Sequence, residues 1–157
     1  MNFSSGFAVY HFMNYSIKAL IGAYIAVLIA FACLDGVWLG VIAMPLYQSA
    51  FDTLLREQFI TWPWLAFYLL YCAAVVYLTI RPYAAQNLLS QSLAGFALGA
   101  AAYGTYNLTC YSIIDDWPLT MTFVDWIWGT TATGIIATCG GWMARKIQHK
   151  ISAPEVT

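Results

Sequence analysis

Four long apolar segments divide the chain, and each is long enough to cross a membrane. They run over residues 18–44, 62–80, 88–114 and 119–144. About 20 predominantly apolar residues are enough for a transmembrane helix. The first segment is too long for the apolar core of a signal peptide, which has about 7–15 residues. The pattern therefore predicts an all-α integral membrane bundle of four helices, formed by one domain over residues 18–146.

The segments outside these four spans have patterns of their own. Residues 1–17 mix polar and aromatic positions, which predicts either a short helix in the membrane interface or a frayed end. Between residues 45 and 61, apolar side chains recur at steps of three and four, which predicts an amphipathic helix on the membrane surface. The polar residues 147–157 are expected to form a disordered tail.

The composition agrees with a membrane protein and argues against a soluble domain and against a nucleic-acid-binding protein. Hydrophobic residues make up 62% of the 157 positions and charged residues 8%, whereas soluble domains have about 25% charged residues. The net charge is −1, and no run of basic residues predicts nucleic-acid binding. The lipid bilayer is thus the first expected partner.

The distribution of basic residues predicts the orientation of the bundle. With four spans, the two termini and the middle loop lie on one side of the membrane. Five of the six Lys and Arg residues fall on that side, and only Arg56 falls on the other. Cytoplasmic loops are enriched in Lys and Arg. Both termini are therefore expected in the cytoplasm, with the protein in a bacterial inner membrane.

Two aspartates lie inside predicted spans, and each precedes a tryptophan by three residues. The pairs are Asp35 with Trp38 and Asp125 with Trp128. A carboxylate at the centre of a span costs about 2.5–3.5 kcal/mol on insertion scales, so it normally faces the bundle interior. Asparagine would cost less at either position, and this favours a functional role for the two acids. Two facing carboxylates can share a proton, which suits a proton-coupled or cation-binding step.

Polar and aromatic side chains from all four spans are predicted to meet at the depth of these acids. Helical spacing places Tyr103, Tyr106 and Asn107 on one face of the third span. This layer falls in the outer half of the membrane, and the inner halves of the spans are nearly all aliphatic. A pocket with aromatic walls and a few polar groups is the usual form of a small-molecule site. The candidate ligand-binding residues are Asp35, Trp38, Tyr68, Tyr71, Tyr103, Tyr106, Asn107, Asp125 and Trp128.

Several chemistries lack the residues that they need. His11 and His149 both lie outside the spans, which excludes a haem held by two histidines in the membrane. The four cysteines fall one per span without the spacing of a metal site. No glycine-rich phosphate loop, zinc-protease motif or nucleophile elbow occurs. No metal and no cofactor are expected, and catalytic residues stay unassigned.

These motifs together resemble a bacterial family of four-helix predicted integral membrane proteins of unknown function. The resemblance covers about residues 20–145. It rests on five motifs, namely Asp35-x-x-Trp38-Leu39-Gly40 with Tyr47, Tyr68-Leu69-Leu70-Tyr71, Tyr103-x-x-Tyr106-Asn107-Leu108-Thr109, Trp117-Pro118-Leu119 and Asp125-x-x-Trp128-Gly129. The third motif of that family usually has Asp where this chain has Asn107. The resemblance implies a shared fold and polar layer, and it implies no activity.

Three functions fit the sequence. The first is a protein that binds or transports a small amphipathic molecule, with Asp35 and Asp125 recognising a cation or a proton. The second is an accessory subunit of a larger membrane complex, in which the polar layer locks the helices together. The third is an enzyme acting on lipid with an aspartate as general acid or base. A face formed by Gly95 and Gly99 suits either packing within the chain or a homodimer.

Overall fold

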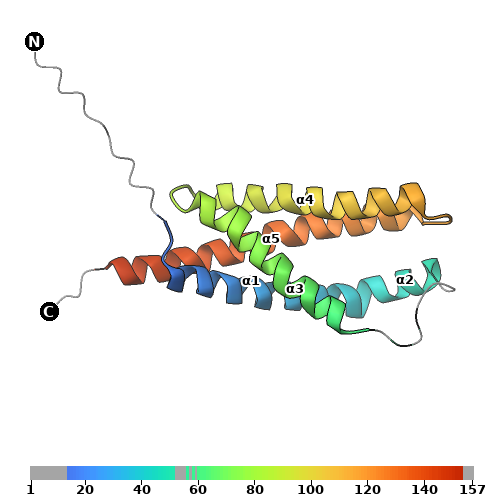
Figure 1. Ribbon diagram of the computed structural model, residues 1–157, viewed down its shortest axis with the longest axis horizontal. Coiled ribbons are helices and arrows are strands. Elements are labelled where there is room, and N and C mark those ends of the chain that lie inside the picture. The colour runs from blue at the N-terminus through green and yellow to red at the C-terminus, as the bar shows by residue number, and fades with distance from the viewer. Residues whose placement is uncertain (1–13, 52–55, 57, 59, 154–157) are drawn as a thin grey trace, which may run out of the picture.

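The computed structural model describes residues 14–51, 56, 58 and 60–153, and these residues form helices with short connections (Figure 1). No strand occurs among them. In chain order the elements are α1 (Ile17–Val37), the π-helix η1 (Trp38–Ala43), α2 (Met44–Ala50), α3 (Trp62–Val75), the π-helix η2 (Val76–Ile80), the short 3₁₀ helix η3 (Arg81–Tyr83), α4 (Leu88–Ile113) and α5 (Leu119–Ser152).

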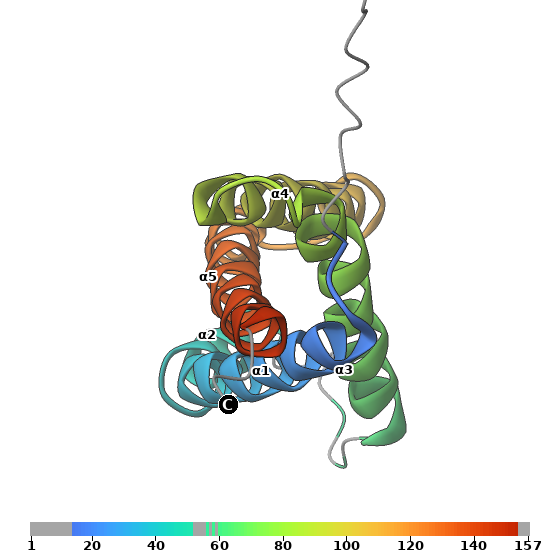
Figure 2. The same cartoon turned by 90° about the vertical axis from the view of Figure 1, so that its left-hand side faces the viewer.

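These elements build four long helical rods that form a bundle: α1 with η1 and α2, α3 with η2 and η3, α4, and α5. Helix α1 lies between α5 and α3, and α4 packs along α5 (Figure 2). Helix α3 crosses the bundle obliquely, so that its last turns and η2 reach α4 and α5 while its first turns lie near α1 (Figure 1). The predicted four-helix, all-α architecture is confirmed.

Helix α1 shows why the outer surface of the bundle suits a membrane. Its N-cap is Ser16, whose Oγ accepts a hydrogen bond of 3.3 Å from the backbone N–H of Ala19. A buried stripe on the helix packs into the bundle, and the opposite stripe of isoleucines is exposed. The buried residues are Ala19, Ala23, Val27 and Phe31, and the exposed ones are Ile17, Ile21, Ile25 and Ile29. An apolar surface of this extent is unusual on a soluble monomer.

Two helical segments are long and apolar enough to span a membrane by length and composition. They are Ile17–Ser49 and Trp62–Tyr83. In the most apolar 18-residue stretch of each segment, only 17% and 28% of the residues are buried. The core helix of a soluble protein would be mostly buried. The first also packs into the bundle through Phe31, unlike a signal sequence that is removed. Helices α4 and α5 carry more polar residues and do not pass the same test.

Glycines bring α4 and α5 unusually close together. A Cβ added at Gly95 would lie 2.5 Å from Cβ of Ala137, and one added at Gly99 would lie 2.7 Å from Cβ of Thr133. Side chains larger than hydrogen would therefore push the two helices apart. The face of Gly95 and Gly99 thus serves packing within the chain, the first of the two uses that its sequence suggests.

The end of the bundle that holds the described chain ends contains a buried polar group, although a nearly aliphatic half was predicted there. Gln91 is completely buried, and its Nε2 donates to the hydroxyl of Tyr15 and to the carbonyls of Ile80 and Tyr83, at 3.0–3.2 Å. Its Oε1 accepts from Nε of Arg145 at 3.5 Å. The prediction of a nearly aliphatic inner half was therefore wrong at this position.

Two predicted boundaries also need correction. The helix that begins with α1 continues through η1 and α2 to Ala50, so no separate surface helix starts at Pro45. Proline fits here because it lies in the first turn of α2, directly after a π-helix that has already shifted the hydrogen-bond ladder. The rest of that predicted amphipathic helix falls mostly outside the described residues, as do residues 1–13. Helix α5 continues to Ser152, so the predicted tail is helical over its first residues.

Candidate functional site

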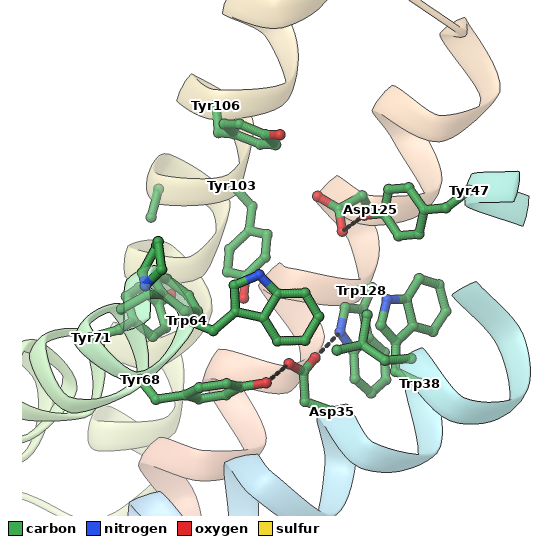
Figure 3. A pocket seen from close by; sticks show the side chains of 14 residues that line it. Asp35, Trp38, Tyr47, Trp64, Tyr68, Tyr71, Tyr103, Tyr106, Asp125 and Trp128 are labelled. Atoms are coloured by element: carbon green, nitrogen blue, oxygen red, sulfur yellow. Dashed lines mark hydrogen bonds between the residues drawn. The ribbon is translucent and has the colours of Figure 1, made fainter. Parts of the chain in front are cut away.

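A cavity of about 670 Å³ lies in the half of the bundle away from the described chain ends. Figure 3 shows the side chains that line it. The ends of α1 and α2, the first turns of α3, and the facing parts of α4 and α5 surround it. Its lining residues are Asp35, Trp38, Leu39, Tyr47, Pro63, Trp64, Phe67, Tyr68, Tyr71, Ala102, Tyr103, Tyr106, Asp125 and Trp128. The cavity exists because the first turns of α3 lean away from α4 and α5.

Asp35 lies near the end of α1 and binds two different helices. Its Oδ2 accepts a hydrogen bond from the hydroxyl of Tyr68 on α3, and its Oδ1 accepts one of 3.4 Å from Nε1 of Trp128 on α5 (Figure 3). Two donors compensate part of the cost of placing a carboxylate in a membrane bundle. The carboxylate is only partly buried and faces the cavity.

A stacked pair of indoles covers the side of the cavity next to Asp35. The rings of Trp38 and Trp128 are nearly parallel, with centroids 4.6 Å apart and an interplanar angle of 7°. Trp38 is the first residue of the π-helix η1. Short π-helical segments occur often at functional sites, because the wider turn displaces side chains from their α-helical positions. The stack ties the end of α1 to α5.

Asp125 lies on α5 and is more deeply buried than Asp35, with 8% of its surface exposed. Its Oδ2 accepts a hydrogen bond of 2.7 Å from Nδ2 of Asn107 on α4, and its Oδ1 accepts one of 3.4 Å from the hydroxyl of Tyr47 on α2. Nδ2 of Asn107 also donates to the carbonyl of Tyr103 at 3.0 Å, which fixes the amide. The two aspartates therefore have separate sets of partners.

Two tyrosines, Tyr71 of α3 and Tyr103 of α4, line the cavity beside these acids. The hydroxyls of Tyr71 and Thr133 are 2.7 Å apart, and Thr133 donates to the carbonyl of Gly129 at 2.6 Å. The ring of Tyr103 meets Tyr71 edge-on, at 6.0 Å between centroids. Tyr103 also lies directly on Gly129, where an added Cβ would come within 2.0 Å of its ring. Gly129 thus makes the space in which Tyr103 sits.

The structure brings the predicted site residues together. Eight of the nine line the cavity, and the ninth, Asn107, lies behind Asp125 and holds it. Sequence reasoning left out Tyr47, Trp64 and Phe67, which also line the cavity. Tyr47 was visible as part of a motif, but its segment was assigned to a surface helix. Trp64 lies at the predicted start of the second span, where a tryptophan is typical of the membrane interface, and Phe67 has no distinguishing signal in the sequence.

Aromatic rings and two carboxyl groups dominate the lining of the cavity. Among the described residues that line it, none is Lys, Arg or His, and Asp35 and Asp125 are the only Asp or Glu residues. Within the described part of the chain, no cluster of three His, Cys, Asp or Glu side chains is placed to hold a metal ion. The cavity therefore suits a group that is positively charged or rich in hydrogen-bond donors, surrounded by an apolar body.

A comparison with known families gives one match. A family model described as "Predicted membrane protein (DUF2177)" matches residues 20–142, which is well over half of the chain. No curated protein and no solved structure matches the chain. The matched range begins in α1 and ends in α5, so it includes every residue that lines the cavity.

Proposed function

The chain belongs to this DUF2177 family of predicted membrane proteins, and we propose that it binds or transports a small amphipathic molecule in the cavity. The observation that carries the proposal is the cavity itself, which encloses two carboxylates within aromatic walls inside a membrane bundle. Buried carboxylates in membrane proteins are costly, and they commonly mark ligand or proton pathways. A role in helix locking alone would not require an open volume beside them.

The proposed ligand has a cationic head and an apolar body. The negative face of an aromatic ring attracts cations, and Trp gives the strongest attraction of the natural side chains. Trp38 and Trp128 stack beside Asp35, so an ammonium group that pairs with this carboxylate would lie next to the aromatic stack. The apolar body would lie against Phe67 and Trp64 on α3.

The two carboxylates have different parts in this proposal. Asp35 is partly exposed to the cavity and pairs with the head group of the ligand. Asp125 is buried and already holds two donors, so it keeps Asn107 and Tyr47 in position. When the cation leaves, Asp35 exchanges it for a proton, which couples ligand release to protonation.

We place the entrance between the first turns of α3 and the facing part of α4. Trp64 and Tyr106 line the cavity from these two helices, and both are exposed, by 48% and 55%. Because this opening faces sideways from the bundle, an amphipathic molecule would enter from the lipid. With both termini in the cytoplasm, as the basic residues favour, the entrance lies in the outer half of a bacterial inner membrane.

The test is native mass spectrometry of the protein in mild detergent or nanodiscs. We expect a small-molecule adduct, or uptake of dodecyltrimethylammonium as a cationic probe. The adduct should be lost in Asp35→Asn and Asp125→Asn but kept in Asp115→Asn, a change in the exposed α4–α5 connection. Probe binding should also weaken at low pH in the wild type. Unchanged binding and pH dependence in both cavity variants would overturn the proposal.

Two other outcomes would favour the alternatives. A stoichiometric protein partner with an empty cavity would indicate an accessory subunit. A lipid product that forms in membranes with wild-type protein, and not with Asp35→Asn, would indicate an enzyme. Either result would contradict a simple binding or transport role.

A further inference from the structure

Two apolar grooves flank α1 in the half of the bundle that holds the described chain ends, separate from the cavity with the two aspartates. The α1–α3 groove has a volume of about 480 Å³ and is lined by Leu20 and Tyr24 from α1 and by Ala73, Val76 and Tyr77 from the opposite wall. Arg81 lines it as well, one turn beyond Tyr77. In a bilayer, an apolar groove of this kind is open to acyl chains.

The α1–α5 groove lies on the other side of α1 and has a volume of about 350 Å³. Ala26 of α1, Leu88 of α4 and Trp142 of α5 are among its lining residues. Figure 2 shows α1 between α5 and α3, which places the two grooves on either side of this helix. The two grooves are therefore separate sites.

Each groove has the same arrangement of an aromatic ring and a cation. The guanidinium carbon of Arg81 lies 5.1 Å from the centre of the Tyr77 ring, and Nζ of Lys146 lies 4.9 Å from the centre of the Trp142 ring. In both pairs the cation follows the aromatic residue by four positions, so the helix holds it one turn closer to the membrane surface. The ring limits the positions that the long side chain adopts.

The charge at this end of the bundle is not balanced by the described acids. Asp35 and Asp125 lie in the cavity at the other end, and Asp115 and Asp116 lie in the connection between α4 and α5, also at that end. Among the described residues, Arg81 and Lys146 thus lack a nearby carboxylate. An anionic head group would supply the missing charge, and arginine in particular binds phosphate with two parallel hydrogen bonds.

We propose that each groove binds one anionic phospholipid, with an acyl chain in the groove and the phosphate beside Arg81 or Lys146. Basic pockets between membrane helices on the cytoplasmic side are the usual places for such head groups. The proposal does not depend on what the cavity with the aspartates binds, because it concerns the opposite end of the bundle. The two lipids would brace α1 against α3 and α5.

The experiment counts retained lipids by native mass spectrometry. The protein is exchanged into detergent containing equal amounts of phosphatidylglycerol and phosphatidylethanolamine. We expect the wild type to retain two phosphatidylglycerol molecules, Arg81→Gln and Lys146→Gln to retain one each, and the double variant to retain none. Arg81→Lys keeps the charge and should retain two. Arg56→Gln, which removes an exposed arginine at the opposite end, should also retain two.

Three results would overturn the proposal. One is equal retention of the anionic and the zwitterionic lipid, which would show that the cations are only general interfacial anchors. Another is an unchanged count of phosphatidylglycerol in the double variant. Retention of a second protein copy in place of lipid would also overturn it, since the grooves would then be an interface between chains.

Discussion

Replacing Gly129 by alanine should damage the bundle in a way that the structure specifies. The new Cβ would come within 2.0 Å of Cγ and Cδ1 of Tyr103, and these atoms belong to the base of the ring, which cannot swing aside alone. The whole tyrosine, or helix α4 with it, has to move. Overpacking of this kind costs about 1–3 kcal/mol.

Gly36→Ala is the matched control. Gly36 is also helical, but an added Cβ there would meet nothing within 4 Å. Both substitutions gain the higher helix propensity of alanine, about 1 kcal/mol, so that gain cancels in the comparison. The free energy of unfolding of Gly129→Ala should therefore lie about 1–3 kcal/mol below that of Gly36→Ala.

The assay is denaturant unfolding in mixed micelles, followed by tryptophan fluorescence and circular dichroism. In a Tyr103→Ala background, Gly129→Ala should lose most of its penalty, because the tyrosine ring that clashes with the new Cβ is then absent. A difference between Gly129→Ala and Gly36→Ala below about 0.5 kcal/mol, the scatter of ordinary surface substitutions, would refute the reasoning. So would a penalty that is the same with and without Tyr103.

Two further substitutions test the hydrogen-bond networks by the same unfolding assay. Asn107→Leu removes the donor 2.7 Å from Asp125 and should cost about 1.5–3 kcal/mol, whereas Thr109→Val, on an exposed position of the same helix, should change little. Equal effects would show that the amide contributes nothing particular. Gln91→Leu should lower the free energy of unfolding by about 1–3 kcal/mol. It should also speed proteolysis before α1, because it removes the hydrogen bond from Gln91 to Tyr15, whereas exposed Gln48→Leu should do neither. Unchanged proteolysis would contradict the idea that Gln91 anchors the segment before α1.

The four rods and the level of the polar layer could be predicted from the sequence, since both follow from short-range rules. The length of an apolar run decides whether a helix can span, and helical spacing decides which residues share a face. The helix formed by α3 and η2 begins and ends at the predicted residues, and α4 also begins where it was predicted. Likewise, Asp35 and Asp125 were conspicuous because a carboxyl group within a long apolar run stands out before its neighbours in the fold are known.

Other features depend on contacts that no local pattern reveals. In the sequence Gln91 is a polar residue near the start of the third span, and only the packing of η2, α4 and α5 buries it. The continuation of α1 through Pro45 depends on the π-helix before it, which has no sequence signal of its own. Tyr47 reaches Asp125 only because that continuation carries α2 toward α5.

The uneven hydropathy of the four rods has a structural reason. Helices α1 and α3 present apolar side chains outward, while α4 and α5 turn glycines, threonines and Asn107 toward each other and the bundle interior. Helices α4 and α5 pack closely through small residues, and the helix formed by α3 and η2 packs against this pair mainly at its η2 end. The cavity occupies the gap left at the other end. A change in the tilt of α3 would therefore open or close the cavity while the α4–α5 pair keeps its packing, which is the kind of motion that the proposed binding or transport would need.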